Sequence, residues 1–102
     1  MQIKILNQAI DDIEKASLFY QSQEEKLGKY FLDSIFSDIE SLKIYYGMHI
    51  KIYGFYRLLA KRFPYAIYYL VKDETIRVYA VLDCRSNPIK IQDRLGKEQC
   101  SF

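Results

Sequence analysis

The sequence contains few of the residues that cross-link or interrupt a small protein: its 102 residues include two cysteines, two prolines, four glycines and no tryptophan. Cys84 and Cys100 are too few for a disulfide framework, and no Cys/His spacing is typical of a zinc site. We therefore expect a domain that folds on its hydrophobic core, with no metal and no cofactor.

Long apolar runs are also absent. No segment reaches the roughly 18 consecutive apolar residues of a transmembrane helix. The N-terminal segment, MQIKILNQAIDDIEK, becomes acidic at residue 11 and lacks the apolar centre of a signal peptide. Together with the scarcity of cysteine, this predicts a cytoplasmic protein with no membrane partner.

The chain is rich in apolar and aromatic residues: 50% of it is hydrophobic, with 10 tyrosines and 6 phenylalanines. Such a composition supports a sizeable core, and the length is typical of one domain and too short for two. Residues 1–102 are therefore predicted to form a single domain.

Charge is distributed unevenly along the chain. Residues 1–47 hold five Lys/Arg and eight Asp/Glu, whereas residues 48–102 hold ten and five, giving net charges of −3 and +5. An acidic partner or a polyanion would meet the C-terminal half first. An ordinary solvated surface explains the same asymmetry equally well, so charge alone identifies no partner.

Hydrophobic periodicity predicts two helices in the first half of the chain. Asn7 is the expected cap of a first helix that runs to about residue 23. A second helix is predicted from about residue 25 to residue 45, with Gly28 loosening its first turn and Gly47 ending it. Because the join between them is short, the two helices should form an antiparallel hairpin.

An alternation of period two predicts strands at Gln2–Leu6, Phe55–Phe63, Ala66–Val71 and Ile76–Arg85, with Lys72–Thr75 as a hairpin turn. Asn87 and Pro88 open a short terminal turn or helix that Gly96 should end. The predicted fold class is α+β, in the order β-α-α-β-β-β with a short C-terminal element. We expect one antiparallel sheet with the helical hairpin packed on one face.

The other face of this sheet is the predicted binding surface. In the last strand, alternation places Ile76, Val78, Ala80 and Leu82 toward the helices, and Arg77, Tyr79, Val81, Asp83 and Arg85 opposite. Arg57 and Lys61, on one face of the Phe55–Phe63 strand, join that second face. The candidate binding residues are Arg57, Lys61, Arg62, Arg77, Tyr79 and Arg85.

Two long stretches resemble a known family. The first, AIDDIEKASLFYQSQEEKLGKYFLDSI, is similar to the paired helices of RelE/ParE toxins, and the second, FYRLLAKRFPYAIYYLVKDETIRVYAVLDCRSNP, is similar to their three C-terminal strands. The RFPY and IYY segments are closest to ParE-type members. The resemblance implies the toxin of a bacterial type II toxin–antitoxin pair, which a cognate antitoxin binds and silences in a hetero-oligomer.

The superfamily divides by target: RelE-type members are ribosome-dependent mRNA endonucleases, and characterised ParE-type members poison DNA gyrase. The resemblance implies that the RNA-cleavage site of RelE-type members consists of lysines, arginines and a C-terminal tyrosine. Arg57, Lys61 and Arg85 match part of this set, but Ala66 stands near the third-strand arginine and no tyrosine follows Arg85. Loss of one positioned cation typically costs about 10²–10³ in rate, so the sequence favours a toxin that is not an enzyme.

Three candidate residues also have structural explanations. His49 is interpreted as a solvated loop histidine, because no Ser, Cys or carboxylate stands at triad spacing. Cys84 is interpreted as a packing residue. Arg57 fits either ligand binding or an ion pair with Asp83 that fixes strand register.

Our hypothesis is a ParE-like toxin that its antitoxin neutralises and that acts on an essential target such as DNA gyrase. The antitoxin segment is expected to fold on binding along apolar residues of the helical hairpin. One alternative is a RelE-like, metal-free mRNA endonuclease acting at the ribosome, with Arg57, Lys61 and Arg85 converging on one concave patch. The other is a divergent member that has lost toxicity and only binds its partner.

Overall fold

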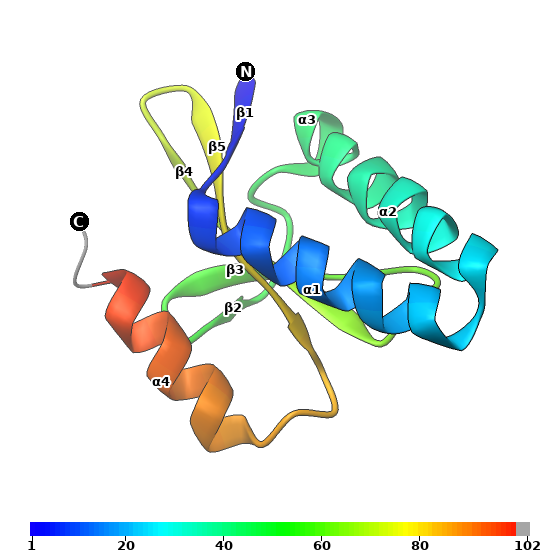
Figure 1. The fold of residues 1–102 in the computed structure, drawn as a ribbon. Helices are drawn as coiled ribbons and strands as arrows, with labels where there is room; N and C mark the ends of the chain where they lie inside the picture. The colour runs from blue at the N-terminus through cyan, green and yellow to red at the C-terminus, as the bar shows by residue number, and fades with distance from the viewer. Residues whose placement is uncertain (100–102) are drawn as a thin grey trace.

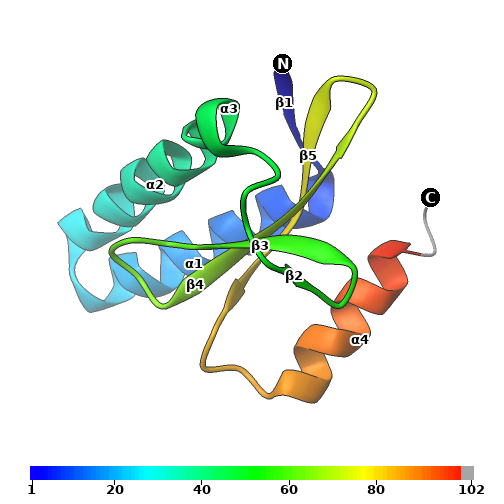
Figure 2. The ribbon, with the colours of Figure 1, turned by 180° about the vertical axis from the view of Figure 1, so that it is seen from behind.

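The computed structural model describes residues 1–99; Cys100 lies outside this range. In chain order the elements are β1 (Gln2–Ile5), α1 (Asn7–Gln23), α2 (Glu25–Glu40), α3 (Leu42–Tyr45), β2 (Lys51–Ile52), β3 (Phe55–Leu59), β4 (Tyr65–Lys72), β5 (Thr75–Asp83) and α4 (Pro88–Gln99). Figure 1 shows the sheet between the α1–α2 hairpin and α4, and Figure 2 shows the same arrangement from behind.

The five strands form one sheet in the order β1-β5-β4-β3-β2. The predicted α+β class and the β-α-α-β-β-β order are confirmed, with an additional two-residue strand, β2, before β3. We expected an antiparallel sheet, but the sheet is mixed. Strand β1 runs parallel to β5, from the Gln2–Thr75 pair to the Ile5–Val78 pair. Alternation marks which residues share a face but carries no information about strand direction.

Each face of the sheet packs against a different helical layer. The predicted hairpin of α1 and α2 covers one face, where Ile13, Phe31 and Ile35 join a core that includes Ile76 and Val78 of β5. On the opposite face, α4 buries Leu95 against a second, smaller core that includes Tyr68 and Ala80. The face that was expected to be open is therefore covered in part by α4 (Figure 1).

A β-bulge in β5 changes which of its residues face the hairpin. Tyr68 pairs with Ala80 while Tyr69 pairs with Val78, so Tyr79 is the extra residue. An extra residue reverses the alternation beyond it. Ala80 and Leu82 consequently pack with α4 and Val81 joins the hairpin core, which is the opposite of the prediction for these three residues.

Helix boundaries differ from the prediction at four residues. Leu6 occupies the N-cap of α1, and Asn7 is its first residue. The chain departs from α-helix at Ser41, which divides the predicted second helix into α2 and α3. Gly28 is buried where α2 crosses α1, so it permits close packing rather than a loose turn. Helix α4 continues through Gly96 to Gln99, whereas Gly47, with φ of 79°, follows the end of α3 as predicted.

Candidate functional site

Arg85 lies just after β5 and is paired with Asp83. Its Nε donates to Asp83 Oδ1 at 3.0 Å and its Nη2 donates to Oδ2 at 2.8 Å. The Arg85 guanidinium holds the pKa of Asp83 below its usual value, and Asp83 raises the pKa of Arg85. The carboxylate of Asp83 would therefore compete with a phosphate for the Arg85 guanidinium.

Arg57 in β3 lies opposite Tyr68 in β4. Burial raises the pKa of the Tyr68 phenol, and the charge of Arg57 and a hydrogen bond from its side chain oppose that rise. The ion pair between Arg57 and Asp83 that the sequence left open is absent, since the partner of Asp83 is Arg85. Arg57 and Arg85 both act electrostatically on the thiol of Cys84, which lies in sequence between Asp83 and Arg85. Cys84 itself is exposed, and its interpretation as a packing residue is wrong.

Lys61 and Arg62 lie in the exposed connection between β3 and β4. The amide of Lys61 donates to Oδ2 of Asp38, a buried residue of α2, at 3.2 Å. This bond ties the Lys61 backbone to the helical hairpin, whereas Arg57 lies on the α4 side beside Tyr68. The three cations of the endonuclease alternative therefore come from both sides of the sheet.

The bulged residue Tyr79 is buried, with 2% of its surface exposed, and its ring lies 5.2 Å from that of Phe55. In this position Tyr79 packs in the smaller core and offers no surface to a ligand. Arg77 is partly exposed on the same face of β5, beside Lys4 of β1. Its Nε atom is buried and has no hydrogen-bond partner in the described part of the chain.

His49 is packed against the protein and is not the solvated loop residue expected from the sequence. Its Nδ1 is hydrogen bonded to the hydroxyl of Tyr69, which also accepts a bond of 3.0 Å from the Gly47 amide. Burial lowers the pKa of His49. Both bonds hold the segment after α3 against β4.

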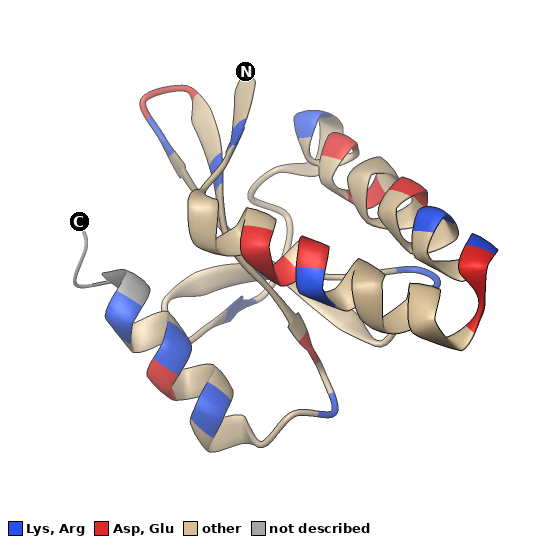
Figure 3. Cartoon of the chain, in the orientation of Figure 1, with Lys and Arg blue, Asp and Glu red and all other residues tan. Residues whose placement is uncertain are grey.

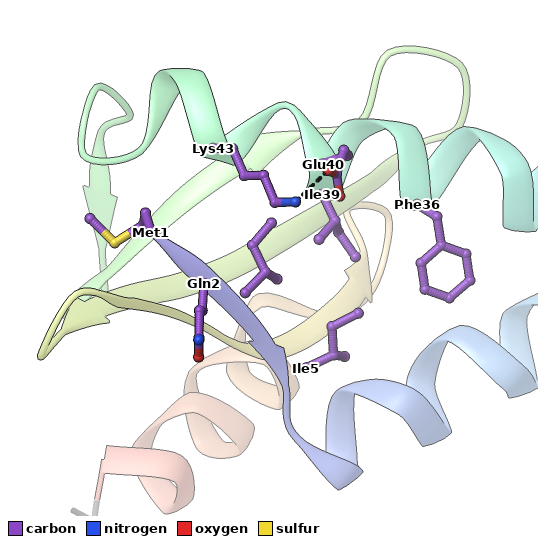
Figure 4. A pocket seen from close by; sticks show the side chains of 8 residues that line it. Met1, Gln2, Ile5, Phe36, Ile39, Glu40 and Lys43 are labelled. Carbon is purple, nitrogen blue, oxygen red and sulfur yellow. Dashed lines mark ion pairs between the residues drawn. The ribbon is translucent and has the colours of Figure 1, made fainter.

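An open groove of about 490 Å³ runs between β1 and α2. Figure 4 shows the side chains of Ile5 and Ile39 directed into it and Phe36 at one end. Lys43 and Glu40, paired at 2.7 Å, form its polar rim. Eight residues line the groove: Met1, Gln2, Ile3, Ile5, Phe36, Ile39, Glu40 and Lys43.

The groove continues along the helical hairpin. Phe36 also borders a smaller hollow of about 170 Å³ between α1 and α2, together with Ile10, Ile13 and Leu32. Phe36 is 46% exposed and Ile10 is equally exposed. Sequence reasoning missed Phe36; the available signal was a phenylalanine beside Ile35 but outside the predicted buried stripe of α2.

Within residues 1–99, no cluster of three or more His, Cys, Asp or Glu side chains could hold a metal ion. None of the helices in the same range is both long and apolar enough to cross a membrane.

A mixed sheet with a helical hairpin on one face and a C-terminal helix on the other, edged by an apolar groove, defines a RelE/ParE-type fold. Residues 3–88 match the family described as ParE toxin of type II toxin–antitoxin system, parDE, and the chain belongs to this family. It is a ParE-like toxin of a type II toxin–antitoxin system, and such a system implies an antitoxin partner.

A solved structure titled "Chromosomal ParDE TA system from P. aeruginosa" contains a chain with the same fold. The TM-score is 0.70 at 20% sequence identity, over 79% of this chain and 92% of that one. By sequence alone, no curated protein matches the chain.

Proposed function

We propose that the antitoxin neutralises this toxin by docking in the groove between β1 and α2, and that the free toxin acts in the cytoplasm by binding DNA gyrase. The observation that carries the first part is the groove itself. An open apolar surface of this kind, with a polar rim, is typical of a site that a partner segment fills.

The form of the groove suits a segment that folds as it binds. Five of its eight lining residues are apolar and the other three, Gln2, Glu40 and Lys43, are polar or charged. Phe36 links the groove to the hollow between α1 and α2. An amphipathic antitoxin segment would bury these side chains and stabilise the complex relative to the free toxin.

The positions and partners of the candidate cations favour a toxin that binds its target over one that cleaves RNA. Metal-free RNA cleavage needs positioned cations to stabilise the charged transition state. Of the candidate cations, Arg85 is paired with Asp83, and Arg57 lies beside Tyr68. Ala66, at the third-strand arginine position, is buried and apolar.

A supercoiling assay tests this proposal. Purified toxin is added to DNA gyrase and relaxed plasmid, with and without an excess of its antitoxin. We expect toxin alone to inhibit supercoiling or to trap cleaved plasmid, and antitoxin to reverse the effect. Full gyrase activity together with ribosome-dependent cleavage of mRNA would instead support the endonuclease alternative.

A further inference from the structure

Two cations lie side by side on the sheet face opposite the groove. Lys4 in β1 is the register partner of Arg77 in β5. Figure 3 shows a blue, positively charged segment on each of these neighbouring strands. Ile3 and Ile5 pack toward the hairpin core, so alternation directs the side chains of Lys4 and Arg77 to the other face. Like charges at paired strand positions destabilise a sheet unless an anion lies close to both.

No carboxylate whose side chain the structure describes forms an ion pair with either cation. Lys29, Lys43, Arg85 and Arg94 each pair with a described carboxylate, whereas Lys4 and Arg77 do not. The buried Nε of Arg77 lacks a hydrogen-bond acceptor, and a buried unsatisfied donor costs about 1–3 kcal/mol. The two like charges, of which Lys4 is exposed, indicate a site that an external carboxylate would complete.

The backbone beside these cations is also available for pairing. Strand β1 is at the end of the sheet. Its Gln2 and Leu6 amides donate to the carbonyls of Glu74 and Val78. Peptide groups alternate in direction along a strand, so those of Ile3 and Ile5 point toward the free edge.

An extended segment that paired with this edge would place its side chains alternately on two sides. One set would enter the groove beside Phe36 and Ile39, and the other would lie on the face of Lys4 and Arg77. We propose that Lys4 and Arg77 form a carboxylate-binding pair that selects an antitoxin segment in which acidic residues alternate with apolar ones. This inference rests on the proposed function, because it assigns the chemistry of the segment that occupies the groove.

The test uses the full chain and its own antitoxin. Binding is measured by calorimetry at low and high salt for wild type, Lys4→Glu, Arg77→Gln and the control Lys51→Glu. Lys51 is an exposed cation on β2, the strand at the other edge of the sheet. Lys4 is exposed, so Lys4→Glu should fold even if Arg77→Gln does not.

We expect Lys4→Glu and Arg77→Gln to weaken antitoxin binding by about tenfold or more and to reduce its salt dependence. The Ile3 and Ile5 amides should exchange more slowly in the complex, and Lys51→Glu should bind like wild type. A lysine introduced at the facing acidic position of the antitoxin should restore binding to Lys4→Glu.

If the antitoxin binds all four proteins equally and the Ile3 and Ile5 amides exchange as in the free toxin, the inference is overturned and the proposed function stands. If wild-type toxin does not bind its antitoxin at all, the proposed function fails, and the inference fails with it.

Discussion

Asp12 in α1 and Arg94 in α4 form a bidentate ion pair across 82 residues of sequence, with Nη1–Oδ1 at 2.8 Å and Nη2–Oδ2 at 2.9 Å. Oδ2 of Asp12 also accepts from the Val81 amide at 3.0 Å, just beyond the bulge in β5. One carboxylate thus joins the first helix, the last helix and the strand between them. Because Asp12 is 13% exposed and Arg94 25%, water screens this pair only weakly.

Removing the Asp12 carboxylate should therefore loosen α4. We expect Asp12→Ala to lower the free energy of unfolding by about 2–3 kcal/mol, since it leaves the Arg94 charge and the Val81 amide without this acceptor. Urea denaturation measures the change. The control is Asp33→Ala, which breaks a Lys29 pair whose side chains are 81% and 67% exposed and should cost about 0.5 kcal/mol or less. Equal effects in the two variants would contradict the structural role of Asp12.

Gly28 and Gly96 should respond oppositely to the same substitution. A Cβ on Gly28 would lie 2.8 Å from the Gln21 Cβ and 2.9 Å from the Ser17 carbonyl oxygen, both in α1. Gly28→Ala should thus force the helices apart and cost about 1–3 kcal/mol. Gly96 lies within α4 with open space around it, and Gly96→Ala should stabilise the protein by up to about 1 kcal/mol. Thermal unfolding of both variants checks the two signs.

His49 should make the fold sensitive to mild acid. Burial lowers its pKa from the ordinary 6.5, so the unfolded chain binds a proton at a higher pH than the folded protein does. The contribution to stability is therefore present above pH 6.5 and is lost as the pH falls through the folded-state pKa. We expect the unfolding free energy to decline as the pH falls below 6.5, and His49→Gln to remove that part of the decline. An unchanged pH dependence in the variant would assign the effect to other groups.

Phe36 tests the position of the antitoxin groove without disturbing the core, because its side chain is already 46% exposed. Phe36→Glu should fold normally and bind antitoxin at least about tenfold more weakly, since it places a charge in an apolar contact. Ile89→Glu is a matched control on α4, where Ile89 is 64% exposed. If both variants lose antitoxin affinity to a similar extent, the proposal that the antitoxin binds in the groove is wrong.

Local patterns predicted most of the elements, because hydrophobic period and turn residues are local signals. The helical hairpin, the β4–β5 turn and the stop at Gly47 all follow from such signals. The bulge at Tyr79 did not, since an extra residue in a strand becomes visible only against its partner strand. Gly96 was wrongly predicted to end α4 because burial of Leu95 in the smaller core outweighs the low helix propensity of glycine.

The candidate site was less accessible to sequence reasoning than the fold. Arg85 and Arg57 were recognised as candidates. Arg85 pairs with Asp83, only two residues away, whereas the sequence had offered Asp83 to Arg57. The contact of Arg57 with Tyr68 depends on the register of β3 and β4, which no local pattern shows. The parallel placement of Lys4 beside Arg77 joins residues from opposite ends of the chain, and no local pattern contains it. The Asp12–Arg94 ion pair is a long-range contact of the same kind, and no local sequence pattern predicts it.

The most direct measurement induces the toxin alone in bacteria and follows DNA, RNA and protein synthesis by pulse-labelling over the first minutes. The account predicts that DNA synthesis stops first and that co-induced antitoxin prevents the arrest. If protein synthesis stops first and mRNA is cut at ribosomes, the proposal of a gyrase-directed toxin is wrong, and Arg57, Lys61 and Arg85 become the catalytic candidates. If growth and all three syntheses continue, the chain is a family member that binds antitoxin without being toxic.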